Sequence, residues 1–148
     1  MTFTDSAKAL LKQLEGLRLN AYQDGGGKWT IGYGHTGADV QPGTLWTQEY
    51  ADEMLDKDLA HFVSGVQALI PSYLNLPDTQ FSALVIFAYN VGVPALAGST
   101  LLRHIKGGLY SYTPADFMAW DHIHKDGQLV VDPGMQARRA AEVKLFTS

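Results

Sequence analysis

The spacing of apolar residues predicts that most of this chain is helical. Apolar side chains share one face of a first helix, which Thr4 or Asp5 can cap and Gly16 can end. A longer helix is expected from Thr47 to just before Pro71, spanning about 30 Å at about 1.5 Å per residue. Further helices are predicted to open at four capping residues, namely Asp78, Ser99, Thr113 and Asp132.

A two-residue period replaces the helical one between positions 29 and 34, which is typical of a β-strand. Apolar side chains there alternate with small or polar ones. One strand face carries Trp29, Ile31 and Tyr33, and the other carries Thr30, Gly32 and Gly34. The run of Asp24 and three glycines before this strand is a turn signal. Residues 17–35 are therefore predicted to form a small antiparallel sheet.

These elements predict an α+β protein with two lobes and an active-site cleft between them. A small β lobe is expected over about 17–46, and the long helix joins it to a larger helical lobe. The helical lobe is expected over about 70–148 and includes the N-terminal helix. The segment after Asp78 is apolar on every side, so we expect it at the centre of that lobe. Without repeats or a linker, 1–148 is predicted to be one domain.

Composition excludes several classes of function. The net charge of −4 disfavours a broad electrostatic hold on nucleic acid, and we expect no nucleic-acid partner. There are no cysteines, so neither disulfides nor thiolate metal sites are available. His122 and His124 would face opposite sides of a helix, and we expect neither a metal nor a cofactor. No apolar run suggests a membrane anchor or a cleavable signal, so we expect a chain held in the cytoplasm.

Glu15 is the first candidate for chemistry because its place disfavours a charge. A carboxylate in the last turn of a helix faces the negative end of the helix dipole, which costs about 0.3–1 kcal/mol. Partial burial would raise its pKa further, as a general acid requires near neutral pH. A solvent-exposed glutamate that is tolerated at a helix end is the alternative.

Asp24 and Thr30 are two further candidates for the same chemistry as Glu15. Taken singly, Asp24 is an ordinary turn residue and Thr30 an ordinary strand residue. Thr30, however, shares its strand face with Gly32 and Gly34, which leave room for a ligand against the backbone. Two carboxyl groups and a hydroxyl at such a face are what the cleavage of a glycosidic bond needs.

The same residues resemble a known family. Glu15, eight intervening residues, Asp24, five intervening residues and Thr30, within "EGLRLNAYQDGGGKWTIGYGHT", are similar to the signature of the phage lysozymes of glycoside hydrolase family 24. The similarity continues through "SALVIFAYNVG", "GSTLL" and "ARRAAE". It implies a lysozyme-like fold and an endolysin that hydrolyses the β-1,4 bond between N-acetylmuramic acid and N-acetylglucosamine. It also implies inversion.

The resemblance assigns roles to residues. It makes Glu15 the general acid, Asp24 the second carboxylate and Thr30 the residue that positions water. Substrate contacts are expected from the strand end, at Gly32, Tyr33, Gly34 and His35. Aligning the long helix with its counterpart in the family predicts that His35 also forms an ion pair with Asp58.

The resemblance also suggests what the protein binds and in which compartment of the host it is found. The expected partner is the glycan strand of peptidoglycan, bound by a monomer. Some family members carry an N-terminal membrane segment, and this chain shows none. We therefore expect an enzyme that waits in the host cytoplasm until a separate phage holin permeabilises the membrane, and then acts on the cell wall in the periplasm.

Three questions stay open at this level. Arg138 and Arg139 either reach an acid in the cleft or cover the last helix with solvated charge. A glycan-binding module without activity is the first alternative function, although the intact Glu15, Asp24 and Thr30 set argues against it. A lytic transglycosylase is the second, and it would not need a water-activating Asp24.

Overall fold

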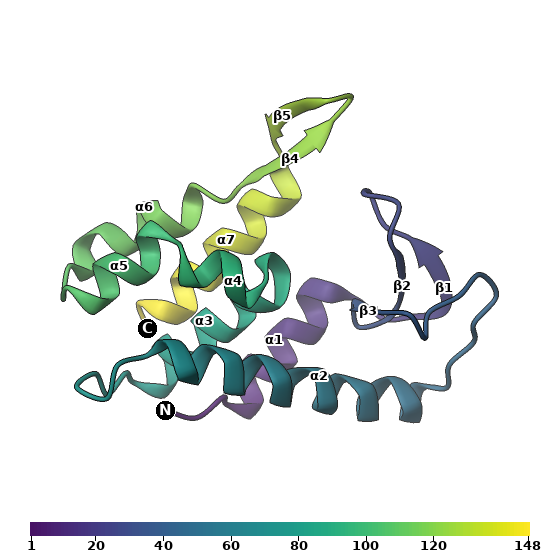
Figure 1. The fold of residues 1–148 in the computed structure, drawn as a ribbon, viewed down its shortest axis with the longest axis horizontal. Coiled ribbons are helices and arrows are strands. Elements are labelled where there is room, and N and C mark those ends of the chain that lie inside the picture. The colour runs from purple at the N-terminus through teal and green to yellow at the C-terminus, as the bar shows by residue number, and fades with distance from the viewer. The chain divides into compact units, whose positions relative to one another are not determined.

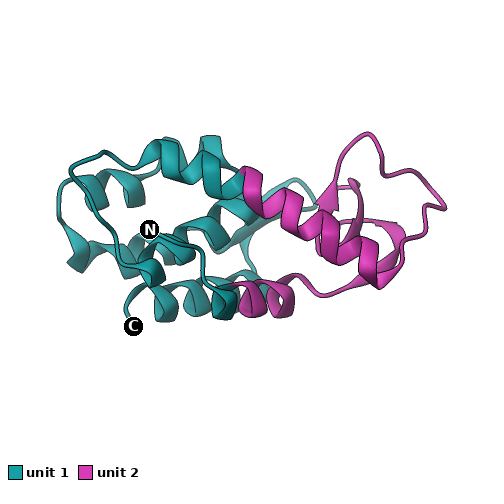
Figure 2. Cartoon of the chain, turned by 90° about the horizontal axis from the view of Figure 1, so that it is seen from below, with its two compact units in different colours: residues 1–7, 62–148 teal, residues 8–61 magenta.

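The computed structural model describes residues 1–148, which form two compact units. Unit 1 comprises residues 1–7 and 62–148, and unit 2 comprises residues 8–61 (Figure 2). Both boundaries fall inside helices, in α1 (Asp5–Glu15) and in α2 (Gln48–Leu69). None of the helices combines the length and the hydropathy that a membrane span requires.

Unit 2 contains a three-stranded antiparallel sheet between parts of two helices. The strands are β1 (Arg18–Gln23), β2 (Trp29–Gly32) and β3 (His35–Thr36), with β2 in the middle (Figure 1). Tyr22 pairs with Thr30, and Thr30 pairs with Thr36 on the other side. Asn20 adds an isolated bridge to Leu45. The sheet that the sequence predicted over 17–35 is confirmed.

The two faces of β2 are both covered by protein. Thr30 and Ile31, which point to opposite faces, are 4% and 0% exposed. The helical parts of unit 2 are linked by ion pairs from Lys8 to Asp56 and from Lys12 to Asp52, the latter at 3.2 Å. The hydrogen bond that Lys12 donates to the Asp52 carboxylate raises the pKa of Lys12. Unit 2 thus holds its central strand in a well-packed setting.

Unit 1 is mostly helical and is built around α3 (Asp78–Val91), whose residues 81–88 are all buried. Around it lie α4 (Val93–Ala97), α5 (Thr100–Lys106), a 3-10 turn (Tyr110–Tyr112), α6 (Thr113–Met118) and α7 (Pro133–Phe146). The expected burial of the apolar helix after Asp78 is confirmed. Phe87 of α3 packs edge to face against Phe117 of α6, with ring centroids 5.5 Å apart.

The predicted helix starts are correct, but two of the predicted caps are wrong. Thr4, Ser99 and Asp132 accept hydrogen bonds from backbone amides in the first turns of their helices, as expected for caps. Asp78 instead accepts a bond from the amide of Thr2 at 2.8 Å. Thr113 donates its hydroxyl proton to the carbonyl of Tyr110 at 2.8 Å. Both side chains serve long-range or preceding segments rather than their own helices.

A second hairpin in unit 1 was not predicted. Strands β4 (His122–Lys125) and β5 (Gln128–Val131) pair in a regular antiparallel register, next to the start of α7 (Figure 1). His122 and His124 therefore lie on a strand, where residues two apart share a face. The expectation that they face opposite sides of a helix is wrong.

Candidate active site

Glu15 is the last residue of α1 and is half-buried. The helix ends because Gly16 adopts a φ of 69°, a left-handed conformation that glycine tolerates best. The Gly16 amide closes the last turn on the carbonyl of Lys12 at 2.9 Å. The predicted place of Glu15 at the end of this helix is confirmed.

Asp24 organises the turn between β1 and β2. Its Oδ1 accepts hydrogen bonds from the backbone amides of Gly26 at 2.9 Å and Lys28 at 2.8 Å. The turn is closed further by the Gly27 amide, which donates to the Asp24 carbonyl at 2.9 Å. These bonds leave the other carboxylate oxygen, Oδ2, free to accept from a ligand or water. The side chain is exposed to solvent.

Thr30 is bound to the same turn through one carbonyl. Its hydroxyl donates to the carbonyl of Lys28 at 3.0 Å, and the Asp24 amide donates to that same carbonyl at 2.9 Å. The structure therefore brings Asp24 and Thr30 together around Lys28. Because the hydroxyl proton of Thr30 is already used, this oxygen acts as an acceptor toward any further partner.

The absence of a side chain at Gly32 makes room for the ring of Trp46. It has a φ of 66°, and a Cβ there would come within 2.8 Å of the Trp46 ring. The space that the sequence assigned to a ligand at Gly32 is thus filled by an indole. Tyr33 is only 7% exposed, with the Lys12 ammonium 5.2 Å from its ring centre, and Gly34 has a φ of 80°. A substrate contact at these three residues stays a prediction.

His35 is held by carboxylates on both of its ring nitrogens. Nδ1 lies 2.7 Å from Asp58 of α2, which confirms the predicted pair, and Nε2 lies 3.0 Å from Asp39. Burial lowers the pKa of His35, but the hydrogen bonds and charges of Asp58 and Asp39 outweigh burial, so its pKa is raised. With both ring nitrogens bound to carboxylates, the geometry favours a structural role for His35. The expected contact between His35 and the substrate stays a prediction.

The paired arginines of α7 are buried, so their interpretation as solvated surface charge is wrong. Arg138 and Arg139 are 6% and 1% exposed. Arg139 bonds to both carboxylate oxygens of Glu142, to the Asn90 side chain and to the Trp120 carbonyl, the last at 2.8 Å. Burial lowers the pKa of Arg139, while the Glu142 charge opposes this shift.

Sequence reasoning missed two parts of this arrangement. The role of the Lys28 carbonyl is invisible in sequence because a backbone atom carries it. Asp39, four residues after His35, had a signal in its spacing, but the acidic residues nearby gave no reason to choose it. The supporting contacts of a site are therefore harder to predict than its carboxylates.

Known proteins share both the sequence and the fold. The phage lysozyme family model matches residues 12–142. The endolysin of Acyrthosiphon pisum secondary endosymbiont phage 1 is 39% identical over 150 residues, which cover 100% of this chain and 99% of that protein. The muramidase domain of SpmX from Asticaccaulis excentricus superposes with a TM-score of 0.89 at 35% identity, covering 99% of this chain and 98% of that one.

A crystal structure of a P22 lysozyme mutant gives a TM-score of 0.79 at 34% identity, covering 100% of this chain and 99% of that one. Both solved structures share the mixture of helices and small antiparallel sheets described above. The α+β, lysozyme-like fold class predicted from the sequence is therefore confirmed. With a family match over most of its length and relatives at this level of identity, the chain belongs to the phage lysozyme family.

Proposed function

We propose that this peptidoglycan-cleaving endolysin hydrolyses the β-1,4 bond between N-acetylmuramic acid and N-acetylglucosamine with inversion. Glu15 is the general acid, Asp24 the general base, and Thr30 the residue that positions the attacking water. The glycosidic oxygen takes the Glu15 proton as its bond to C1 breaks. Water attacks C1 from the opposite face and gives its proton to Asp24.

The shared Lys28 carbonyl is the observation that carries this proposal. It ties the Asp24 backbone and the Thr30 hydroxyl to one atom, at 2.9 Å and 3.0 Å. A water between them can donate one proton to Asp24 Oδ2 and the other to Thr30 Oγ1, since both oxygens accept. Its lone pair is then free to attack. Such an arrangement supplies orientation before the reaction begins.

Replacing Glu15 with Gln tests the acid. The amide keeps the shape of the side chain but has no acidic proton, so we expect lysis of peptidoglycan to fall by about 10²–10⁴-fold. Thermal unfolding of the variant should match that of the parent. A folded variant that keeps more than about a tenth of the activity would show that Glu15 is not the acid.

The stereochemistry separates three reactions. NMR of freshly cleaved glycan should show the α-anomer first, because water enters opposite the departing oxygen. A β-anomer would mean a covalent intermediate on Asp24 and would contradict inversion. Mass analysis should find reducing ends, whereas 1,6-anhydro ends would identify a transglycosylase.

The place of action and the need for a holin follow from the substrate, which lies in the cell wall. We propose that the enzyme acts on the cell wall as a monomer, after a separate phage holin has opened the membrane of the host. Induced expression without a holin should then leave cells intact until chloroform is added. Prompt lysis without a holin would contradict this order of events, and a dimer in analytical ultracentrifugation would contradict the monomer.

A further inference from the structure

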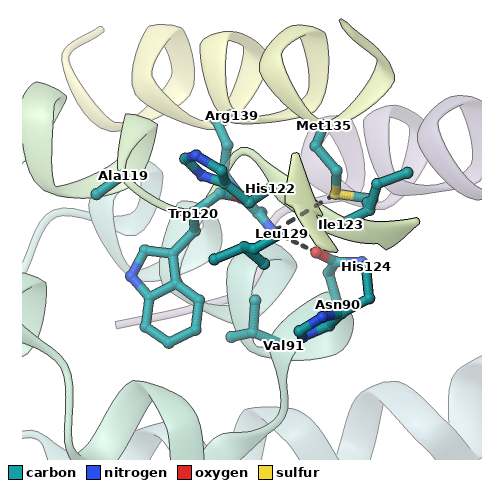
Figure 3. A pocket seen from close by; sticks show the side chains of 10 residues that line it. All are labelled: Asn90, Val91, Ala119, Trp120, His122, Ile123, His124, Leu129, Met135 and Arg139. Carbon is teal, nitrogen blue, oxygen red and sulfur yellow. Dashed lines mark hydrogen bonds between the residues drawn. The ribbon is translucent and has the colours of Figure 1, made fainter. Parts of the chain in front are cut away.

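Two pockets of unit 1 differ in how their positive charges are balanced. The larger, about 450 Å³, lies beside the β4–β5 hairpin, where Arg139 donates to the side-chain oxygen of Asn90 (Figure 3). Glu142 bonds to Arg139 at 2.7 Å and so balances its charge. The smaller, about 230 Å³, lies where α4 leads into α5 and is lined in part by Arg103 and Lys106. No carboxylate lines this smaller pocket, so its charge is available to an anion.

Arg103 and Lys106 form a local positive surface on an acidic protein. Both are exposed, and their spacing of three places them on one side of α5. Neither forms an ion pair within the protein. Between Asp78 and Asp116 the sequence has no acidic residue and no other lysine or arginine. In a chain with a net charge of −4, this stretch can attract an anion that the rest of the surface repels.

The next carboxylate along the chain, Asp116, is paired with a histidine of the same helix α5. Its Oδ2 lies 2.6 Å from Nδ1 of His104, and its side chain is only 11% exposed. The ring of His104 in turn lies 4.9 Å from the ring of Tyr112. Asp116 therefore leaves the two cations without an acidic partner and holds an aromatic side chain beside them.

Three large apolar side chains are exposed around these cations. Tyr73 is 70% exposed, Leu109 47% and Tyr112 54%. Tyr73, in the loop after α2, donates its hydroxyl proton to the carbonyl of Lys106 at 3.3 Å (Figure 1). The Leu109 amide donates to the carbonyl of His104 at 2.8 Å, which folds the chain back against the end of α5. Apolar residues gathered in this way indicate an interaction surface, whereas single exposed ones do not.

We propose that this surface docks on a bilayer that contains anionic phospholipid. A lipid phosphate binds Arg103 and Lys106 at the smaller pocket, and Tyr73, Leu109 and Tyr112 enter the layer of headgroups. Tyrosine suits such a layer because its ring is apolar and its hydroxyl is polar. Lysine and arginine near an anionic membrane add electrostatic attraction. The contact is peripheral, since it uses exposed side chains of one short helix and its neighbouring turns.

A bilayer fits the whole surface, whereas other anions fit only part of it. A free phosphate would use the two cations and leave the exposed apolar side chains without a role. Nucleic acid needs a broader positive surface than two cations on a chain with a net charge of −4. The whole surface lies in unit 1, whereas the candidate catalytic residues lie in unit 2. The inference thus goes beyond the proposed hydrolysis and does not depend on the roles assigned there.

Vesicles of phosphatidylglycerol and phosphatidylcholine test the proposal, with vesicles of phosphatidylcholine alone as the control. We expect the intact chain to sediment with the anionic vesicles and to stay in solution with the neutral ones. Binding should weaken as the salt concentration rises, because salt screens exposed charges. Equal sedimentation with both kinds of vesicle, or sedimentation with neither, would overturn the proposal.

Three glutamine variants test the cations at equal change of net charge. Arg103→Gln and Lys106→Gln should each weaken binding to the anionic vesicles by about fivefold. Lys125→Gln removes an exposed charge on β4, which lies away from α5 in unit 1, and should leave binding unchanged (Figure 1). Thermal unfolding should be the same in all three. Equal losses would show that net charge, rather than this surface, controls binding.

Two serine variants test the apolar part in the same way. Leu109→Ser should weaken binding by about threefold or more, because less apolar surface leaves water. Leu45→Ser changes a leucine of unit 2 that is 73% exposed, and should have no effect. Unchanged binding in a folded Leu109→Ser would remove the apolar contact from the proposal and overturn docking of the whole surface.

Two further results would contradict the proposal in favour of another partner. Inorganic phosphate that shifts the NMR signals of Arg103 and Lys106, without any binding to anionic vesicles, would assign the pocket to a small free anion. Binding to a short single-stranded DNA that equals binding to the vesicles, and is lost in the same glutamine variants, would assign the surface to polyanions in general.

Discussion

The two hairpins of this protein differ in how much structure supports them. In unit 2, the turn between β1 and β2 is held by the Asp24 side chain, and β3 adds a third strand. In unit 1, β4 and β5 form a sheet of two strands only. Ile31 on β2 is 0% exposed, whereas Leu129 on β5 is 62% exposed. Two-stranded hairpins are marginal without such support.

This difference bears on the role proposed for the first hairpin. The general base role proposed for Asp24 would need a carboxylate and a water held in one geometry, and the supported turn suits that role. The same supersecondary unit is therefore supported by a third strand in unit 2 and left as two exposed strands in unit 1.

The largest expected effect comes from comparing the two aspartates that precede a turn glycine, Asp24 and Asp126. Asp24→Asn keeps an oxygen for the amides of Gly26 and Lys28 but removes the carboxylate that we propose as the base, so we expect activity to fall by about 10²–10⁴-fold. Asp126, with a φ of 52°, tolerates Asn because both residues adopt left-handed backbone. Asp126→Asn should leave hydrolysis unchanged. Turnover on purified peptidoglycan measures both, and equal losses would contradict the contrast.

A smaller effect is expected from the anchor of β3. Asp58→Asn weakens a hydrogen bond to a charged imidazole, which should lower the free energy of unfolding by about 1.5–3 kcal/mol. Asp39→Asn, at a side chain that is 52% exposed, should cost less, about 0–1 kcal/mol. Urea unfolding of the two variants checks this order. The reverse order would mean that Asp39 is the real anchor.

The same anchor should respond to pH with a defined sign. The pKa of His35 is raised in the folded state, so folded protein holds this proton more tightly than unfolded chain. The stabilisation is therefore complete below the unfolded pKa of about 6.5 and is lost as pH rises through the folded value. NMR titration of His35 should give a lower pKa in Asp58→Asn. An unchanged titration would contradict the pairing.

Comparably small effects are expected at the two turn glycines, Gly27 and Gly127. They have φ values of 81° and 78°, and a Cβ at either would meet open space. Alanine at each should cost about 1–2 kcal/mol of backbone strain. Only Gly27→Ala should also slow hydrolysis, because the Gly27 amide bonds the Asp24 carbonyl. Hydrogen exchange should show the cost of Gly127→Ala in β4 and β5 alone.

Much of this structure could be predicted because local rules and packing agree. Gly16 ended the first helix, Thr47 opened the long one, and alternation around Thr30 gave the first sheet, as the structure confirms. The contact between His35 and Asp58, 23 positions apart, was predicted only through the family resemblance. The pattern of residues in a sequence therefore predicts local structure more readily than contacts between residues far apart in the chain.

The second hairpin escaped prediction for a physical reason. Asp126 and Gly127 form a strong turn signal, but the flanking residues are only half apolar and do not sustain the alternation of a half-buried strand on both sides of the turn. His122 and His124 are exposed on β4, so burial imposed no pattern on them. The contacts of Arg139 were also hidden, since sequence alone gives no reason to bury a charge.

The docking of residues 1–7 in unit 1 constrains how the chain folds as it is synthesised. The amides of Thr2 and Thr4 bond to Asp78 and Ser82, 76 and 78 positions later. At about 5–20 residues per second, the ribosome needs about 4–15 s to supply those partners. Residues 8–61 form a continuous unit and can fold during this delay. The first segment made is thus among the last to find its place, and its release should be an early step in unfolding.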